Sequence, residues 1–323
     1  MKYKLLFTII CILCSTHLFA QTHTDELGAE TDNDSYLLQG SDRYYTDGYF
    51  MYFRHAMPVK DTAKMQNKVL GFEFGQKIYN PQTGSIADVN GVDHPDYIDR
   101  PFAAYLYVGS TLNFLYNDES NLKLSAQIGM IGPDAYGEQV QTYVHKLLGF
   151  YKPSGWEYQI DNNFVVNLSA QYDKLLARSS FFDFSLTSYV NLGNGFSGAG
   201  IGPLFRIGNF NQLFNSISTQ STVSRGTTKP LLHKHEFFFY YNPIINYVAY
   251  DATIQGGLFT PKSPNSMEVT EDKEPFILSN EIGVGFTTNR FVFNVAVILH
   301  TLDDKEMVQS HQWGAITGLY RFK

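Results

Sequence analysis

The sequence predicts an all-β protein, a single transmembrane antiparallel β-barrel of about 12 strands with one short loop helix. Segments that alternate between apolar and small polar residues recur along the chain, and only one stretch has a clear helical pattern. Aromatic residues and glycine are abundant, with 26 Phe, 22 Tyr and 26 Gly, whereas charged residues make up 17% of the chain. This composition suits many strands joined by tight turns, with aromatic residues at the membrane interfaces.

The N-terminus has the pattern of a secretory signal peptide. Lys2 and Lys4 precede an apolar run over residues 5–13, and Leu18-Phe19-Ala20 stands immediately before Gln21. We therefore expect residues 1–20 to be removed during export from the cytoplasm.

The remaining residues, 21–323, are expected to form one outer-membrane β-barrel domain, because the chain contains no linker and no repeat of fixed period. Cys11 and Cys14 both lie in the signal, so the mature chain has no thiol for a disulfide or a metal site. The net charge of −7 becomes −9 when Lys2 and Lys4 leave with the signal. With no basic stripe, nucleic acid is not an expected partner.

The strand pattern is clearest over residues 121–132. One face carries Leu122, Leu124, Ala126, Ile128 and Met130, and the other carries Lys123, Ser125, Gln127 and Gly129. The same alternation recurs in residues 70–77, 163–171 and 182–191. Since the polar face consists mainly of Gly, Ser, Asn, Gln and Thr, it suits a barrel lumen better than a surface in bulk water.

Similar runs give twelve segments, an even number as bacterial barrels require. They begin near residues 25, 48, 68, 102, 121, 163, 180, 199, 235, 276, 290 and 312. Residues 235–254 count as one long strand bent near Pro243. Tight turns such as Asn289-Arg290 are expected on the periplasmic side, and the long connections 80–100, 133–162, 210–234 and 260–275 on the outside.

The helical stretch covers residues 132–149. Its apolar side chains fall at helical spacing, at Val140, Val144, Leu147 and Leu148. Glu138, Gln141 and His145 lie on a second, polar face. We expect the helix to pack through its apolar side and to present the polar side for chemistry.

Two motifs resemble known sites only by their letters. Residues 193–198, GNGFSG, match a dinucleotide fingerprint, but a strand rather than a helix follows them, so they predict a turn. Asp32-Asn33-Asp34 opens like a calcium loop, but the twelfth position counted from Asp32 is Arg43 rather than Glu. The sequence contains no Gly-x-Ser-x-Gly, HExxH or CxxC motif, the usual signatures of nucleophile-elbow hydrolases, zinc proteases and thiol redox sites.

Five motifs together carry a family resemblance. They are TDND at residues 31–34, DRYYTDG at 42–48, DRPFAAYLYVG at 99–109, IGPDAYGEQVQTYVHKLLG at 131–149 and GWEYQI at 155–160. In this order and spacing they resemble the outer-membrane lipid A deacylase family, LpxR. The resemblance implies a twelve-stranded barrel that removes the 3'-linked acyloxyacyl group of lipid A in the outer leaflet. It also implies dependence on Ca2+ and a site between the outer barrel rim and a loop helix.

The resemblance assigns a role to five residues. His145 would be the general base, and an imidazole with a pKa of about 6.5 suits that task at neutral pH. Gln141 would orient water or substrate, and Thr46 would make a polar contact beside the ester. Asn33 and Asp34 would hold the calcium ion and the base, since calcium prefers amide and carboxylate oxygens. Water, backbone carbonyls or Glu138 would complete the calcium shell.

The chain departs from the best-known family members at two places. They carry an acidic residue shortly after the histidine helix and a basic pair after the third strand. Here these neighbourhoods read Phe150-Tyr151-Lys152 and Ser85-Ile86-Ala87-Asp88. Lys77 and Arg100 are the candidates for the missing positive charge, which the phosphate groups of the substrate require.

The expected partners are lipid A or lipopolysaccharide as substrate and the surrounding outer-membrane lipid, with the protein a monomer in the outer membrane of a Gram-negative cell. Two alternatives remain open. The first is a non-catalytic outer-membrane barrel whose helix plugs the lumen. The second is an outer-membrane phospholipase with a serine nucleophile beside a histidine.

Overall fold

The computed structural model describes residues 23–37, 42–61 and 63–323. Within these residues, twelve strands form one closed barrel in which each strand pairs antiparallel with its neighbours in the chain, and the first pairs with the last. The strands are β1 (Asp25–Asn33), β2 (Tyr44–Ala56), β3 (Met65–Asn80), β4 (Ala103–Tyr116), β5 (Ser120–Ile131), β6 (Asn163–Arg178), β7 (Phe182–Gly193), β8 (Phe196–Asn209), β9 (Phe237–Asp251), β10 (Phe276–Thr287), β11 (Phe291–His300) and β12 (His311–Phe322). The predicted fold class and strand count are confirmed.

Helices occupy the connections between these strands. Two are α-helical, α2 (Gly137–Leu148) and the single turn α3 (Ala252–Gln255). The short 3-10 helices are η1 (Asp34–Leu37), η2 (Pro95–Tyr97), η3 (Pro133–Ala135), η4 (Trp156–Tyr158), η5 (Leu213–Asn215) and η6 (Ile217–Thr219). None of the described helices combines the length and the apolar character needed to cross a bilayer. The predicted signal peptide, residues 1–20, lies outside the described residues.

The long strand β9 is continuous, as expected, although it contains Pro243. Pro203 of β8 lies opposite this proline, and the regular pairing of the two strands is interrupted between Ile201–Ile245 and Phe205–Tyr241. Proline cannot donate to a strand ladder, which explains the gap. A Cβ atom on Gly202 would lie 1.8 Å from the Pro243 carbonyl oxygen, so only glycine fits there.

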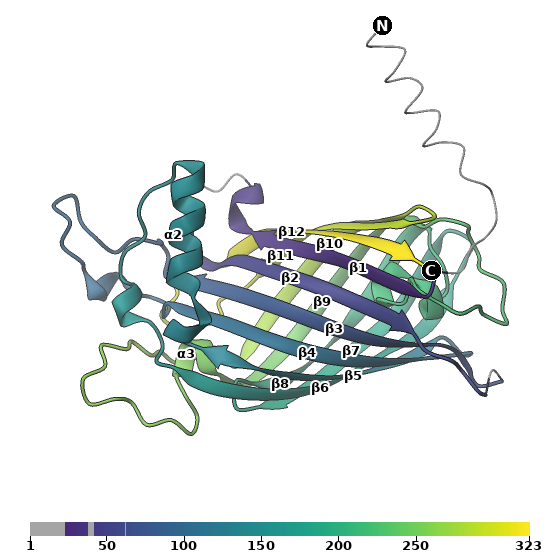
Figure 1. The fold of residues 1–323 in the computed structure, drawn as a ribbon, viewed down its shortest axis with the longest axis horizontal. Helices are drawn as coiled ribbons and strands as arrows, with labels where there is room; N and C mark the ends of the chain where they lie inside the picture. Colours follow the sequence, from purple (N-terminus) through teal and green to yellow (C-terminus); the bar gives the residue numbers. More distant parts are fainter. Residues whose placement is uncertain (1–22, 38–41, 62) are drawn as a thin grey trace, which may run out of the picture.

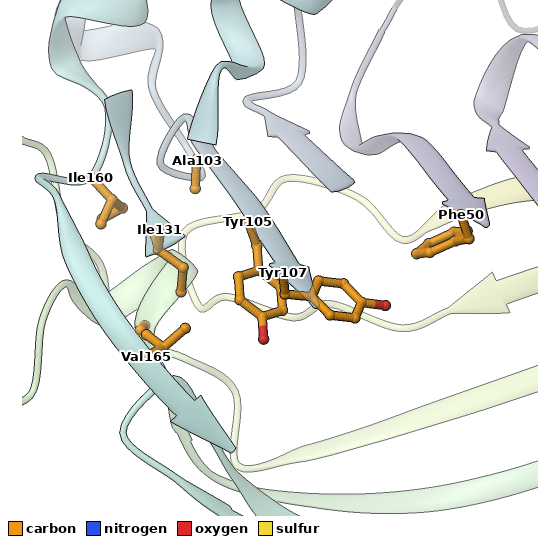
Figure 2. Close-up of a cluster of buried hydrophobic side chains, with 8 residues drawn as sticks. Phe50, Ala103, Tyr105, Tyr107, Ile131, Ile160 and Val165 are labelled. Atoms are coloured by element: carbon orange, nitrogen blue, oxygen red, sulfur yellow. The ribbon is translucent and has the colours of Figure 1, made fainter. Parts of the chain in front are cut away.

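The apolar face of each strand points outward. Leu124 and Ile128 of β5 are 42% and 50% exposed, whereas their neighbours Lys123 and Gln127 line a cavity of about 590 Å³ in the lumen. At the α2 end of the lumen, Tyr105 and Tyr107 of β4 stack with ring centroids 4.6 Å apart and project inward beside Val165 (Figure 2). Lipid therefore meets the apolar side of the wall, and the small polar side faces the interior.

The two ends of the barrel differ. Helix α2 lies across one end, and the C-terminus lies at the other (Figure 1). Most long connections, including residues 81–102, 132–162 and 252–275, are at the α2 end. Because outer-membrane barrels have long loops outside and short turns inside, we call the α2 end the outer end. The turn at Asn289-Arg290 joins β10 and β11 at the opposite end, as expected.

One long connection was assigned to the wrong end. Residues 210–236, which we call the floor segment, join β8 to β9 at the end that carries the C-terminus. In a closed antiparallel barrel, every connection after an even-numbered strand returns to that end. The floor segment folds back into the barrel, where Phe214 and Val223 are buried against Leu115.

Candidate active site

The register between β1 and β2 brings the first two residues of the site together. Asn33 of β1 pairs directly with Asp47 of β2, so both side chains lie on the same face of the wall. Asn33 Nδ2 donates to Asp47 Oδ1 at 2.5 Å. Leu27 and Met51, which alternate on the same face of these strands, are exposed to the outside. The pair therefore lies on the outer surface of the barrel, at its outer end.

A bulge at the start of β2 brings in Thr46. Tyr45 pairs with Tyr79 and Asp47 pairs with Ile78, so Thr46 is an extra residue without a partner on β3. Its hydroxyl donates to Asp34 Oδ2 at 3.3 Å, and the backbone N–H of Arg43 donates to the same oxygen at 3.0 Å. Asp34, which begins η1, is 1% exposed.

His145 reaches this group from α2 through a residue to which the sequence had given no role. His145 Nε2 lies 2.6 Å from Asp42 Oδ2, and Nδ1 lies 2.7 Å from the carbonyl oxygen of Tyr151. Asp42 interacts electrostatically with both Asp34 and Asp47. The structure thus places an imidazole and three carboxylates in one region of the outer rim.

Gln141 lies one turn before His145 on α2 and is fully buried. Its side-chain amide is hydrogen-bonded to neighbouring side chains. Its Nε2 donates to Asp42 Oδ2 at 2.7 Å and to Asn80 Oδ1 at 3.2 Å, and its Oε1 accepts from Trp156 Nε1 at 2.8 Å. These contacts hold the Asp42 carboxylate in place. Gln141 is therefore better suited to positioning Asp42 than to orienting water directly.

The expected orientation of α2 holds only in part, because Val140 of the apolar stripe packs against the barrel core but the polar face is buried more deeply. The polar residues Gln141 and His145 are buried against the barrel, whereas Leu147 and Leu148 of the apolar stripe are 70% and 58% exposed. Hydrogen bonds to the barrel hold the polar face of the helix in its buried position. The apolar face can remain exposed because it lies beside lipid, where apolar side chains need no protein partner. Glu138 is also exposed, away from the buried contacts of Gln141.

Burial and neighbouring charges shift the pKa values of Asp34 and His145. Burial raises the pKa of Asp34 to about 8, and the nearby carboxylates of Asp42 and Asp47 add to the rise. Burial lowers the pKa of His145, but the hydrogen bonds to Asp42 and Tyr151 outweigh it, so its pKa lies above its ordinary value. The contact with Asp42 therefore favours the protonated form of His145.

Lys77 and Arg100 do not supply positive charge to this site. Both line the lumen cavity, on the opposite face of the wall from Asn33 and Asp47. Arg100 is 1% exposed, its guanidinium carbon lies 4.2 Å from the centre of the Tyr79 ring, and its Nη2 donates to Thr253 Oγ1. These contacts hold the Arg100 side chain inside the lumen.

Sequence reasoning missed Asp42 and the Tyr151 carbonyl. Asp42 was interpreted as an ordinary residue at the end of a strand, although it opens the DRYYTDG motif in the same connection as Asp34. That position was the available signal. No side-chain pattern identifies a backbone carbonyl such as that of Tyr151, because its position depends on how the chain leaves α2 at Gly149.

Comparisons with solved structures place the fold among outer-membrane barrels. LpxR from Salmonella typhimurium superposes with a TM-score of 0.69 at 22% identity, over 92% of this chain and 99% of that chain. The β domain of the Bordetella autotransporter BrkA gives 0.44 at 8% identity, over 94% and 99% of the two chains. The translocator domain of NalP from Neisseria meningitidis gives 0.43 at 9% identity, over 100% and 95%. These last two similarities are too weak to bear on function.

No curated protein sequence matched the chain. A family model described as outer membrane protein LpxR, however, matches residues 6–322, nearly the whole sequence. The motifs and the twelve-stranded barrel agree with this match. The chain therefore belongs to the LpxR family of outer-membrane proteins.

Proposed function

We propose that this protein is a calcium-dependent lipid A 3'-O-deacylase, which hydrolyses the 3'-linked acyloxyacyl ester of lipid A in the outer leaflet. Membership of the LpxR family and the barrel fold support an outer-membrane lipid A deacylase. The observation that carries the proposal is the His145–Asp42 pair beside Asn33, Asp34 and Thr46 on the outer face of the rim. A lipid in the outer leaflet meets this face directly.

In the proposed mechanism, His145 is the general base. Nδ1 donates its proton to the Tyr151 carbonyl, which fixes the ring and leaves Nε2 as the basic nitrogen. When the Asp42 carboxylate turns away, the pKa of the imidazolium falls and Nε2 loses its proton to solvent water. It then takes a proton from a water molecule that attacks the ester carbonyl carbon. The acyl C–O bond breaks, and His145 returns the proton to the leaving sugar oxygen, giving a carboxylic acid and a free 3' hydroxyl.

The residue types at the rim suit calcium, although the carboxylates of the described residues Asp34, Asp42 and Asp47 do not all come within 4.8 Å of one another. Asp34, Asp42, Asp47 and Asn33 offer the carboxylate and amide oxygens that calcium prefers. The high pKa of Asp34 is the effect expected of a buried carboxyl group near other acidic residues when no cation offsets them. Calcium, when bound, would polarise the ester carbonyl as a Lewis acid. Asp42 would be one of the residues that hold the ion, and it is also the partner of His145 Nε2.

The apolar side of α2 supports a lipid substrate. Tyr143, Leu147, Leu148 and Phe150 are each more than half exposed and lie next to the buried His145. Helix α2 also runs across the outer ends of the strands, transverse to the long axis of the barrel, as an interfacial helix does (Figure 1). Acyl chains can pack against this face while the ester reaches His145.

The alternatives receive less support. No residue of α2 is among those that line the lumen cavity, so within the described structure the helix is no plug. Nor does any hydrogen bond join a serine hydroxyl to an imidazole among the described residues; the partners of the imidazoles include Asp25, Arg225, Asp42, Tyr151 and Asp303. A serine phospholipase needs such a bond.

The decisive experiment replaces His145 by Ala. Lipid A from cells that express the wild type should lose its 3'-linked chains, and lipid A from cells with His145→Ala should keep them, as measured by mass spectrometry. His94→Ala, a substitution of a histidine in the 81–102 loop, is the matched control and should leave deacylation intact. Chelation should stop the wild type, and added calcium should restore it. Deacylation by His145→Ala would refute the assigned base.

A further inference from the structure

The hairpin of β11 and β12 carries a second cluster of ionisable side chains, in the lumen. His300 ends β11 and pairs directly with His311, the first residue of β12, so register places both imidazoles on one face. Asp303 lies in the connection between them. All three line the lumen cavity. The cluster therefore lies on the opposite face of the wall from the proposed active site.

The three side chains converge on one point. His300 Nδ1 lies 3.2 Å from Asp303 Oδ1, and His311 Nε2 lies 3.5 Å from Asp303 Oδ2. All three ligand atoms lie within 4.8 Å of one another. Among the described residues, no other group of three histidine, cysteine or acidic side chains converges so closely.

The environment of His311 indicates that this cluster binds a ligand. It is 4% exposed, yet neither of its ring nitrogens makes a hydrogen bond. A buried polar group without a hydrogen-bond partner is unfavourable and rare in folded proteins. Packing holds the ring in this position, since Trp313 stacks on it at 5.3 Å between ring centroids and Tyr44 meets it edge-on at 5.6 Å.

The geometry points to a binding site for a divalent transition-metal ion, zinc in particular, formed by His300 Nδ1, the Asp303 carboxylate and His311 Nε2. Two imidazoles and one carboxylate are a familiar zinc donor set, whereas calcium selects oxygen. Donors on a tetrahedral zinc ion are roughly 3.4 Å apart, given bonds of about 2.0–2.2 Å. The 3.2 and 3.5 Å separations, one to each oxygen of Asp303, are close to this value, and the three ligand atoms all lie within 4.8 Å of one another. Water from the lumen cavity takes the fourth position.

The surrounding charges tolerate a dication. Arg100 interacts electrostatically with Asp303 and His311 and opposes metal binding. Asp251 and Asp304 interact with the same guanidinium and offset it. A bound ion would join the ends of β11 and β12 to the connection between them. Since Val308 of that connection donates to Asp99, which accepts from Tyr44 at the start of β2, the ion would also stiffen the outer rim.

Metal binding to the full-length protein in detergent tests the inference. Protein stripped of metal by chelation is titrated with zinc in excess calcium, which keeps zinc from the rim carboxylates, and bound zinc is measured by mass spectrometry. We expect one zinc ion per chain at micromolar concentration. His300→Gln and His311→Gln should each bind at least about tenfold more weakly, since even outer-shell changes cost 10–100-fold.

Two matched variants separate this cluster from other histidines. His94→Gln removes a partly exposed histidine 3.7 Å from both Asp88 and Asp96, and His145→Gln removes the partner of Asp42. Both should bind zinc like the wild type. Undiminished binding in His300→Gln and His311→Gln, or no micromolar binding by the wild type, would overturn the inference.

A measurement on the wild type alone covers the case in which the variants fail to fold. X-ray absorption of the zinc-loaded protein should show two imidazole ligands and oxygen donors. Cobalt in place of zinc should give the intense visible bands of a four-coordinate ion. A zinc ion coordinated by oxygen alone would equally refute the site.

Discussion

Single residues determine the protonation state of the candidate base. Asp42 and His145 are far apart in the sequence, yet their contact of 2.6 Å raises the pKa of the imidazole despite its burial. In calcium-free protein at neutral pH, this contact favours an imidazolium, which cannot accept a proton. Since Asp42 is also a proposed calcium ligand, we expect metal binding and activation of the base to be coupled through this carboxylate.

The Asp42→Asn variant tests this coupling. In calcium-free wild type, the His145 pKa, measured by NMR, should lie above the ordinary value of about 6.5. It should fall when calcium is added to the wild type, and it should already be low in Asp42→Asn and indifferent to calcium. Deacylation should nevertheless drop, because the variant lacks a proposed calcium ligand. Equal titration curves for the two calcium-free proteins would contradict the coupling.

The same pair makes stability depend on pH in a defined direction. A histidine whose pKa is raised by folding contributes stability that is complete below its unfolded pKa of about 6.5 and lost as the pH rises through the folded value. Without calcium, the wild type should therefore lose its advantage in denaturant stability over Asp42→Asn as the pH rises through that window.

At the scale of elements, α2 shows that helical periodicity alone does not predict which face of a helix is buried. The spacing of Val140, Val144 and Leu147 correctly predicted an amphipathic helix, but the buried side is the one with Gln141 and His145. Periodicity identifies two faces without stating which medium each one meets. Gly137 reinforces the observed docking, since a Cβ there would lie 2.5 Å from the Ala104 Cβ.

The Leu147→Ser/Leu148→Ser double variant tests the lipid-facing role of α2. Burial of one leucine side chain is worth about 1.5–3 kcal/mol, so losing these contacts should raise KM for lipid A in bilayers by about tenfold or more while kcat is kept. Lys146→Ser, an exposed neighbour, is the control. An unchanged KM, or a loss confined to kcat, would show that substrate does not use this face.

At the scale of the whole molecule, closure of the barrel keeps three regions of the structure apart. The rim cluster lies on the outer surface, the His300–Asp303–His311 cluster in the lumen, and the floor segment at the opposite end. Asn67 Nδ2 donates to the Val223 carbonyl at 2.8 Å, and Asn113 Nδ2 donates to that of Thr219 at the same distance. The floor segment is thus tied to the barrel wall far from the candidate active site.

Phe214→Ala tests whether the floor segment closes the lumen. Removing a buried phenylalanine ring costs about 3–5 kcal/mol of local packing, so the segment should loosen and small solutes should enter proteoliposomes faster in a swelling assay. Deacylation should be unaffected, because the rim lies at the other end. Phe181→Ala, an exposed aromatic in the turn between β6 and β7, is the control. A swelling rate equal to that of the wild type would argue against a closing role.

The sequence predicted most of the fold and the components of the candidate site. The strand starts agree with the structure to within four residues, the largest difference being 48 against 44 at β2. That shift arises because the bulge at Thr46 breaks the alternation on which the prediction depended. The motif order supplied Asn33, Asp34, Thr46, Gln141 and His145 as candidates, whose catalytic roles remain predictions.

By itself, the sequence determined the alternating strands, their even number, the amphipathic helix and the candidate reagents, because each depends on neighbours within a few residues. Only the tertiary structure decided that Asp42 meets His145, that the polar face of α2 is the buried one, and that His300 and His311 meet Asp303 in the lumen. The physical reason is that a side chain's face follows from local backbone geometry, whereas its partner depends on barrel register and on which surfaces meet lipid.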